Sequence, residues 1–373
     1  MHRTPHPVAS ASLHLRSESL SLRRREFLGF LAGTALAAAV PGSDVRAQTA
    51  TRREVRVGGK RAKVIDLHAH CAIAEVAPLI KGTPFEREFP AFQLLGPKRI
   101  EAMDARGIDI QALSINQYWW YDADRKLAER IVRTHDEALA AWCKQHPDRF
   151  VALSSVALQF PDLAAAQLEH AVRKLGLRGA SIGGHVRGEV PSGPKYDVFW
   201  AKAQELDVPV FMHPGGAENI VREGAWEGRG DLGNIIGNPL ETTFFLSHLI
   251  FDGTLDRFPR LKIGAAHAGG YLPSYLGRSE IACQVRKSAS CANMRKPSEY
   301  LRSQIIVDSM IFSSEGLRHL VAEVGAGQIV YGSDLPYDWP DTIDLIVAEP
   351  SLKDADKLAI LGGNLARLLR ISS

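Results

Sequence analysis

The sequence predicts an α/β protein with a single-domain (β/α)8 TIM barrel. Between residues 63 and 372, eight short apolar or β-branched runs alternate with longer segments of helical periodicity. Such alternation is typical of a parallel sheet. Eight β–α units within ~310 residues match what a barrel requires. A doubly wound open sheet is the alternative, but no Gly-x-Gly-x-x-Gly turn follows the first run, and this favours the barrel.

The first half of this segment contains four apolar runs, each followed by a helical segment. The runs are Lys63–Leu67, Gln111–Ile115, Phe150–Val156 and Gly179–Ile182. The expected helices lie near Lys98–Arg106, Asp122–Gln145, Pro161–Leu175 and Asp197–Leu206. In the third helix, Asp162 stands near the start and Gly176 just past the end, which are usual start and stop signals.

The second half repeats this pattern. Its apolar runs are Val208–Met212, Lys262–Ala266, Ile305–Asp308 and Ile329–Tyr331. The expected helices are Pro239–Phe251, one from Tyr271, one near Ser314–Gly325, and terminal helices from Asp341. Proline suits the first helical position because the N–H that it lacks has no partner within the helix there.

Residues 1–47 have the pattern of a twin-arginine signal peptide. Arg23-Arg24-Arg25 precedes a mildly apolar run from 29 to 40, and Val45-Arg46-Ala47 places small residues before a cleavage site at Gln48. The apolar run is too short and too weak for a membrane span. We therefore expect a periplasmic or secreted protein; an uncleaved amphipathic arm is the alternative. Residues 48–62 are polar and basic, and we expect a leader or a short hairpin before the barrel at 63–373.

Composition and cysteine spacing exclude several classes. The net charge of +3, without a basic stripe of interleaved aromatics, argues against nucleic-acid binding. Cysteines at positions 71, 143, 283 and 291 form no Cys-x-x-Cys pair. This spacing excludes a thiolate zinc knuckle and a dense disulfide framework. One bridge between Cys283 and Cys291 and free thiols both remain compatible with the sequence.

Residues that can bind a metal or move a proton stand at the ends of four runs. His68 and His70 close the first run, His213 follows the fifth, His267 the sixth and Asp334 the eighth. The carboxyl ends of barrel strands meet at one mouth, so we expect these side chains to converge. His68 and His70 point to the same side if the run is a strand, because side chains alternate with period two.

Four of these residues offer a suitable metal-ligand set of three imidazoles and one carboxylate: His68, His70, His213 and Asp334. This set suits Zn²⁺, with Mn²⁺, Fe²⁺ or Co²⁺ as alternatives. Such an ion lowers the pKa of bound water toward ~7. We expect His267 to be the catalytic proton carrier, since an imidazole pKa near ~6.5 suits acid–base work. Asp308, at the seventh run, is interpreted as a support for this site or as a capping group.

Several motifs in one order extend this pattern from Val64 to the C-terminus. They include Asp66-Leu67-His68-Ala69-His70, Gly179-Ala180-Ser181-Ile182-Gly183-Gly184-His185, Pro239-Leu240-Glu241-Thr242-Thr243, His267-Ala268-Gly269-Gly270 and Gly332-Ser333-Asp334-Leu335-Pro336. With these motifs the chain resembles the amidohydrolase superfamily. Within it, the chain is similar to the branch of aminocarboxymuconate-semialdehyde decarboxylase and related metal-dependent aromatic-acid decarboxylases.

This resemblance implies a distorted (β/α)8 barrel, zinc on the four ligands named above, and His267 as the acid/base. It also implies a homodimer in which Arg278, eleven residues after His267, enters the neighbouring site and binds substrate carboxylate, as a planar guanidinium can. Arg87, in the loop after the first run, is a second candidate for a carboxylate contact. Trp119 is expected either to stack on the substrate or to pack at the barrel top.

The resulting hypothesis is a metal-dependent, non-oxidative decarboxylase that removes CO2 from a small aromatic or unsaturated carboxylic acid without an organic cofactor. The alternative is a hydrolase on the same barrel that attacks an amide, ester or lactone. Gly215-Gly216 follows His213-Pro214, where the decarboxylase of this branch carries a bulky aromatic residue. The pocket wall therefore differs, and the resemblance does not define the substrate.

Overall fold

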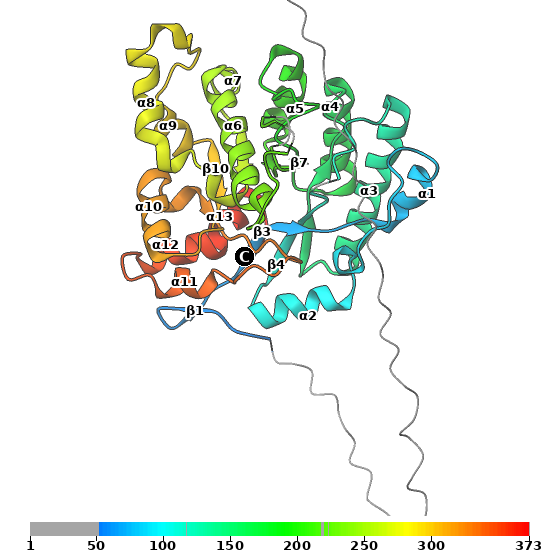
Figure 1. Cartoon of the computed structure of the whole chain (residues 1–373). Coiled ribbons are helices and arrows are strands. Elements are labelled where there is room, and N and C mark those ends of the chain that lie inside the picture. Colours follow the sequence, from blue (N-terminus) through cyan, green and yellow to red (C-terminus); the bar gives the residue numbers. More distant parts are fainter. Residues whose placement is uncertain (1–51, 117, 218–219, 223, 373) are drawn as a thin grey trace, which may run out of the picture. The chain divides into compact units, whose positions relative to one another are not determined.

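Parallel strands alternate with helices in the part of the chain that the computed structural model describes, residues 52–116, 118–217, 220–222 and 224–372 (Figure 1). The expected signal peptide, residues 1–47, lies outside these residues. Within the described ranges, no helix combines the length and the apolar character needed to cross a bilayer. The predicted α/β class and its parallel sheet are confirmed.

The strands form two parallel ladders. The first contains, in spatial order, β3 (Ile65–His70), β4 (Ile110–Ser114) and β5 (Phe150–Ala152). The second contains β6 (Ser154–Ser155), β7 (Ala180–Ile182), β8 (Pro209–Met212), β9 (Lys262–Ala265), β10 (Ile305–Asp308) and β11 (Ile329–Val330). The predicted run Phe150–Val156 is therefore divided between two strands.

The two ladders meet at both edges and close into a ring. Only Leu153 separates β5 from β6, and its N–H continues the hydrogen bonding to β4. At the other edge, the N–H of Leu67 donates to the carbonyl of Tyr331 over 3.0 Å, and Ala69 forms a parallel bridge with Leu335. This closed arrangement is the one that the (β/α)8 prediction requires.

Helices follow the strands along the chain. The longer ones are α2 (Pro97–Arg106), α3 (Arg125–Gln145), α4 (Pro161–His170), α5 (Asp197–Leu206), α6 (Asn238–Phe251), α8 (Leu276–Val285) and α10 (Ser314–Val324). Short helices are α1 (Ala77–Ile80), α7 (Thr254–Arg257), α9 (Pro297–Leu301), α11 (Ile343–Ala348), α12 (Asp354–Leu358) and α13 (Asn364–Leu368). The predicted helix Pro161–Leu175 changes to a π-helical turn at residue 171.

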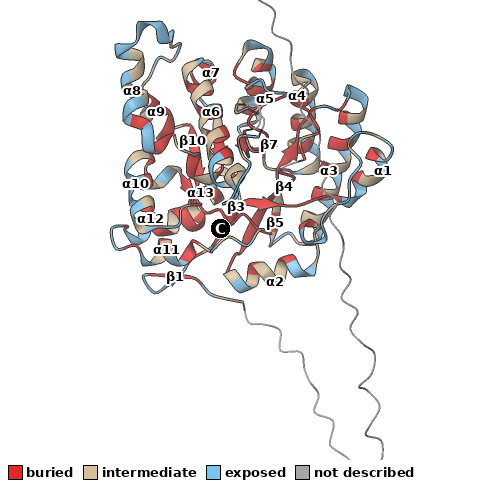
Figure 2. Cartoon of the chain, in the orientation of Figure 1, coloured by how far each residue is buried: buried red, intermediate tan, exposed pale blue. Residues whose placement is uncertain are grey.

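Apolar side chains fill the inside of the ring. Figure 2 shows the strands as the most deeply buried elements. One buried cluster takes alternate residues from strands, among them Ile65 and Leu67, and extends to Leu365 and Leu369 near α13. Alternate residues of a strand share a face, so these side chains occupy the interior. Polar residues at the strand ends are thereby left to form the mouth.

A short hairpin precedes the barrel within residues 52–62, the described part of the segment for which a leader or a short hairpin was expected. β1 (Arg56–Val57) pairs antiparallel with β2 (Lys60–Arg61). Gly58 and Gly59 have φ of 56° and 78°, a region that favours glycine because it lacks a Cβ. The side chain of Arg61 reaches Asp109 at 2.6 Å, and this ion pair connects the hairpin to the residues just before β4.

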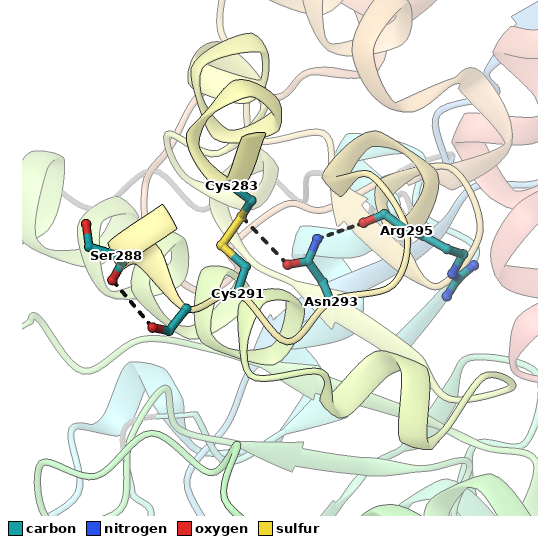
Figure 3. Close-up of a disulfide and its surroundings, with 6 residues drawn as sticks. Cys283, Ser288, Cys291, Asn293 and Arg295 are labelled. Atoms are coloured by element: carbon teal, nitrogen blue, oxygen red, sulfur yellow. Dashed lines mark hydrogen bonds between the residues drawn. A yellow bond between two sulfur atoms is a disulfide. The ribbon is translucent and has the colours of Figure 1, made fainter. Parts of the chain in front are cut away.

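A disulfide joins Cys283 in α8 to Cys291 in the following loop (Figure 3), with their Cα atoms 6.0 Å apart. The sequence left this bridge and free thiols open, and the structure contains the bridge. Cys71 and Cys143 are free. Beyond the bridge, the side-chain amide of Asn293 donates to the carbonyl of Arg295 over 2.8 Å, so the loop is also held by its own hydrogen bonds.

Candidate metal centre

The two histidines of β3 point to the same side. His68 and His70 end a strand whose residues are all buried, and their Nε2 atoms lie 3.1 Å apart. The ladder between β3 and β4 shifts register between Asp66 and Ala69. The two histidine side chains nevertheless stay close together. This distance confirms that the two side chains point the same way, as their two-residue spacing predicts.

His213 and Asp334 come from elements far away in the chain and join these two histidines. His213 directly follows β8, and Asp334 lies shortly after β11. All four residues are buried, and each offers one ligand atom such that these atoms lie within 4.8 Å of one another. Oδ1 of Asp334 is 2.7 Å from Nε2 of His70 and 3.1 Å from Nε2 of His68. The expected convergence therefore occurs.

The polar atoms of this cluster fit a divalent cation. Nδ1 of His70, Nδ1 of His213 and Oδ1 of Asp334 are buried, and no described residue gives them a hydrogen bond. The short distances from Asp334 to the imidazoles thus lack hydrogen-bond geometry. Buried polar groups without partners are costly and call for an explanation. Three imidazoles and one carboxylate are the donors that zinc and similar ions prefer.

The cluster is electrostatically polarised. Burial alone raises the pKa of Asp334, but the charges of His68 and His70 outweigh it and lower that pKa below its usual range. Burial lowers the pKa of His68, yet Asp334 and the hydrogen bond to Asp308 raise it to about 10. Burial, reinforced by His70 and His68, lowers the pKa of His213 well below its usual value. His213 is thus neutral, the form that binds metals.

Asp308, at the end of β10, acts both as a support and as a backbone cap, so its two interpretations are both correct. Its Oδ2 accepts from Nδ1 of His68 over 2.7 Å and from the N–H of His267 over 2.9 Å. Its Oδ1 accepts from the N–H of Ala268 over 2.7 Å. Gly332 permits this packing, because a Cβ there would lie 2.9 Å from Cβ of Asp308.

His267 lies directly after β9, beside the cluster. Its ring centroid is 5.2 Å from that of His68 and 5.2 Å from that of His213. His267 and Ala268 have φ of 55° and 56°, a sparsely populated region for residues with a Cβ, and Asp308 holds both of their N–H groups. Burial, followed by the charge of His68, lowers the pKa of His267 to about 4. The imidazole is therefore neutral at pH 7.

Asp66 binds the backbone on both sides of the cluster through hydrogen bonds. This role was not predicted from the sequence. Its Oδ1 accepts from the N–H groups of His68 and Ser333, each over 3.0 Å. Its Oδ2 accepts from Oγ of Ser333 over 2.6 Å and from Nε2 of Gln111 over 2.8 Å. Burial raises the pKa of Asp66 to about 6. An acidic residue within an apolar strand was the signal available for this role.

The three expected substrate contacts lie outside the cluster. Arg278, on α8, is exposed and has neither an ion pair nor a hydrogen bond with another residue that the structure describes. The guanidinium of Arg87 lies over the ring of Trp120, 5.2 Å from its centroid. Trp119 is half-buried and packs on Gly183, where a Cβ would lie 2.9 Å from Cδ1 of Trp119. Packing at the barrel top is thus observed for Trp119, and stacking on a substrate stays a prediction.

Two further polar residues, Asn116 and Tyr337, belong to segments that follow strands. Asn116 directly follows the second predicted run and is 1% exposed. Its Oδ1 accepts from Oγ of Ser181 over 2.8 Å, while its Nδ2 has no partner among the described residues. Tyr337 lies three residues after Asp334, with its ring centroid 5.0 Å from that of His70. The position of Asn116 just past a predicted strand was the signal that could have identified it, whereas Tyr337, seven residues after β11, offered no such signal.

The chain is similar to several characterised decarboxylases. A family model described as amidohydrolase matches residues 65–371. A 2-amino-3-carboxymuconate-6-semialdehyde decarboxylase from Dictyostelium discoideum is 28% identical over 316 residues, which cover 82% of this chain and 84% of the relative. A gamma-resorcylate decarboxylase from Rhizobium sp. is 30% identical over 286 residues, 73% of this chain and 86% of the relative.

A solved structure extends the similarity to three dimensions. It is that of a dihydroxybenzoic acid decarboxylase from Polaromonas sp. JS666 with bound manganese and the inhibitor 2-nitroresorcinol. The two chains align with a TM-score of 0.71 and 27% identity, covering 83% of this chain and 97% of the other. The fold and the sequence thus point to the same group of proteins.

Proposed function

The chain belongs to the amidohydrolase family, and on this premise we propose that it is a metal-dependent, non-oxidative decarboxylase of small aromatic carboxylic acids. The observation that carries this proposal is the buried set of three histidines and one aspartate, with ligand atoms within 4.8 Å, and His267 beside it. Relatives named as decarboxylases of aromatic or unsaturated acids support the same reaction.

The four residues of the cluster would hold one divalent ion: His68, His70, His213 and Asp334. Zn²⁺ is favoured by the three imidazoles, whereas Mn²⁺ is supported by the ion in the Polaromonas structure. When bound, such an ion acts as a Lewis acid toward the oxygens of a carboxylic acid. Asp308 holds Nδ1 of His68, which directs the other nitrogen of that ring to the cluster.

His267 is proposed to move the proton. Loss of CO2 breaks the bond between the carboxyl carbon and the carbon of the substrate, and the electron pair stays on the latter. A proton has to replace the carboxyl group there. The neutral imidazole of His267 accepts a proton from water at one nitrogen while it releases one at the other. The reactants are the carboxylate and one water, and the products are the arene without its carboxyl group, CO2 and hydroxide, so atoms and charge balance.

Three residues at the mouth are proposed to recognise the acid. Asn116 offers a buried amide N–H group without a partner in the described chain, and a phenolic or carboxylate oxygen would satisfy it. Arg87 supplies a guanidinium, and Trp119 supplies an aromatic edge at the end of β7. A hydroxylated aromatic acid combines the features that these groups recognise.

We also propose a homodimer in which Arg278 completes the partner's site. Tyr275 directly precedes α8, and Arg278, Ile281 and Val285 follow along that helix at intervals of three or four residues, which places these side chains on one face. Tyr275, Ile281 and Val285 are 64%, 50% and 67% exposed. Such an apolar stripe around an arginine suits a self-complementary contact with a second copy.

Export remains a proposal, carried by the twin-arginine pattern and supported by the disulfide between Cys283 and Cys291, since such bonds persist in oxidising compartments. Replacing Arg23, Arg24 and Arg25 by lysine tests it. The expected result is retention of the variant in the cytoplasmic fraction of a bacterial host that exports the parent chain. Equal distribution of the two proteins would contradict export by this route.

The reaction is tested by offering the metal-loaded protein two groups of compounds and following CO2. The first group contains gamma-resorcylate and other hydroxybenzoates; the second contains lactones and amides. We expect CO2 from members of the first group and no hydrolysis of the second. Turnover confined to the second group would instead establish a hydrolase.

A further inference from the structure

Glu241 is a buried carboxylate that has no part in the proposed reaction. It lies in the first turn of α6 and is 2% exposed. Its Oε1 accepts from the N–H of Gly184 over 3.1 Å. Its Oε2 accepts from the N–H groups of Gly215, Gly216 and Ala217, each over 2.9 Å. Four peptide N–H groups thus compensate for the burial of its charge.

The groups that Glu241 holds belong to the loops at the mouth of the barrel. Gly215 is separated from His213 only by Pro214, whose ring restricts the backbone between them. The packing around the loop is close, because a Cβ on Gly237 would lie 2.5 Å from the carbonyl oxygen of Gly216. Movement of this loop relative to α6 is therefore restricted.

His213 differs from His68 in how its ring is oriented. Asp308 holds Nδ1 of His68 through a hydrogen bond of 2.7 Å. Nδ1 of His213 has no such partner within the described chain. The backbone N–H of His213 donates to the carbonyl of Ile182 over 2.9 Å. The position of the His213 ring thus depends on the backbone that surrounds it.

A second side chain near the start of α6, two residues after Glu241, holds the loop after His267. Oγ1 of Thr243 accepts from the N–H of Tyr271 over 2.7 Å and donates to the carbonyl of Pro239 over 2.7 Å. A Cβ on Gly270 would lie 2.6 Å from this Oγ1. Thr243 and Glu241 thus bind different loops from neighbouring positions of α6. A substitution at Thr243 therefore serves as a comparison for one at Glu241.

We propose that Glu241 is a positioning residue for the metal centre, which it serves by fixing the loop that follows His213. This inference rests on the proposed function, in which His213 is a metal ligand. Glutamine at position 241 keeps the shape of the side chain but replaces one acceptor oxygen with an N–H donor that faces peptide N–H groups. At least one of the four hydrogen bonds is then lost. This loosens the loops that Glu241 holds, and we expect His213 to move from the geometry that binds the ion.

The test compares Mn²⁺ binding to metal-free proteins by calorimetry and the visible spectrum of the Co²⁺-loaded proteins. Glu241→Gln should bind Mn²⁺ about 10- to 100-fold more weakly than the parent, the range found for residues that orient ligands, and should alter the Co²⁺ spectrum. Thr243→Val should bind Mn²⁺ with the parent's affinity. Glu349→Gln is the matched control, since Glu349 is also buried and accepts from the N–H of Ser351 over 3.0 Å.

Glu241→Asp covers the case in which the glutamine variant does not fold, because it retains the charge on a shorter side chain. It should show weaker Mn²⁺ binding than the parent in a protein with a native circular dichroism spectrum. Parent-like affinity and Co²⁺ spectrum in a folded variant at position 241 would overturn the positioning role alone. Absence of Mn²⁺ and Co²⁺ binding by the parent would overturn the proposed metal centre, and the positioning role with it.

Discussion

The carboxylate of Asp308 and the imidazole of His68 form a fully buried hydrogen-bonded pair, with Oδ2 2.7 Å from Nδ1. The same oxygen accepts from the N–H of His267. One side chain therefore orients a candidate ligand and the backbone of the candidate proton carrier. We therefore expect this shared support to couple the geometry of metal binding to that of proton transfer.

Asp308→Asn tests this coupling. An amide donor in place of the carboxylate oxygen would face Nδ1 of His68 or the N–H of His267, so both contacts are disturbed. We expect Mn²⁺ affinity to fall about 10- to 100-fold, together with kcat. Asp122→Asn, at an exposed ion pair with Arg187, should leave both quantities unchanged. Parent-like metal affinity and kcat for Asp308→Asn would refute the shared support.

His213→Ala and His267→Asn should separate metal binding from proton transfer. His213→Ala removes one of four converging donors, and we expect loss of bound metal with loss of turnover. His267→Asn leaves the four donors intact and should keep metal while kcat falls about 10²- to 10⁴-fold. Metal analysis of the purified proteins and initial rates measure the two effects. The assignment fails if both variants retain metal and full activity.

Arg278 is tested by mixing two inactive variants. If Arg278 acts across subunits, Arg278→Ala and His267→Ala dimers should each be inactive, while hybrids contain one intact site. Random exchange of equal amounts should then restore roughly a quarter of the parent activity. Two different affinity tags on the variants, with co-purification of both subunits through one tag, check that the subunits exchange. No recovery despite exchange would argue that Arg278 serves its own subunit or no site.

Asp136, on α3, makes folding stability dependent on pH. Burial raises its pKa from 3.8 to about 8, so the folded protein holds a proton that the unfolded chain releases. This contribution is present below pH 3.8 and is lost as the pH rises toward 8. Asp136→Asn mimics the protonated form, and its free energy of unfolding in urea should decline less than the parent's between pH 5 and pH 8. Parallel pH dependences of the two proteins would contradict the assignment.

The disulfide should stabilise the loop after α8. Cys283 and Cys291 are separated by eight positions in the chain, and closing a loop of that size contributes roughly 2–3 kcal/mol in the chain-entropy model. Replacing both residues by serine should lower the free energy of unfolding by about that amount. A reductant should weaken the parent and leave the double variant unaffected. Equal sensitivity of both proteins to the reductant would exclude the bridge as the cause.

The strands, the helices and the four candidate metal ligands were predictable, because neighbouring residues in the sequence indicate them. Apolar runs and helix start signals located most strands and helices, because each depends on neighbouring residues. His68, His70, His213 and Asp334 were identifiable because strand ends of a barrel share one mouth. Their convergence within 4.8 Å follows from the strand order, which the alternation of runs already indicates.

Apart from Asp308, which ends a predicted run, the supports of the site were not predictable, because their partners are distant in sequence. Asp66 holds Ser333 across 267 positions, and Glu241 holds loops that follow two different strands. The apolar run around Asp66 indicates that its carboxylate is buried, but nothing local identifies the distant partners of Asp66 or Glu241. The break at Leu153 likewise depends on the closure of the ring, which the apolar run Phe150–Val156 does not encode.

The proposed reaction requires the metal cluster and His267 together to replace a carboxyl group by a proton. Its most direct test is the reaction of the Mn²⁺-loaded protein with gamma-resorcylate in D2O, followed by NMR. We predict one equivalent of CO2 and deuterium at the carbon that carried the carboxyl group, both abolished by removal of metal and by His267→Asn. Equal CO2 release and deuterium incorporation without metal or with His267→Asn would contradict the account.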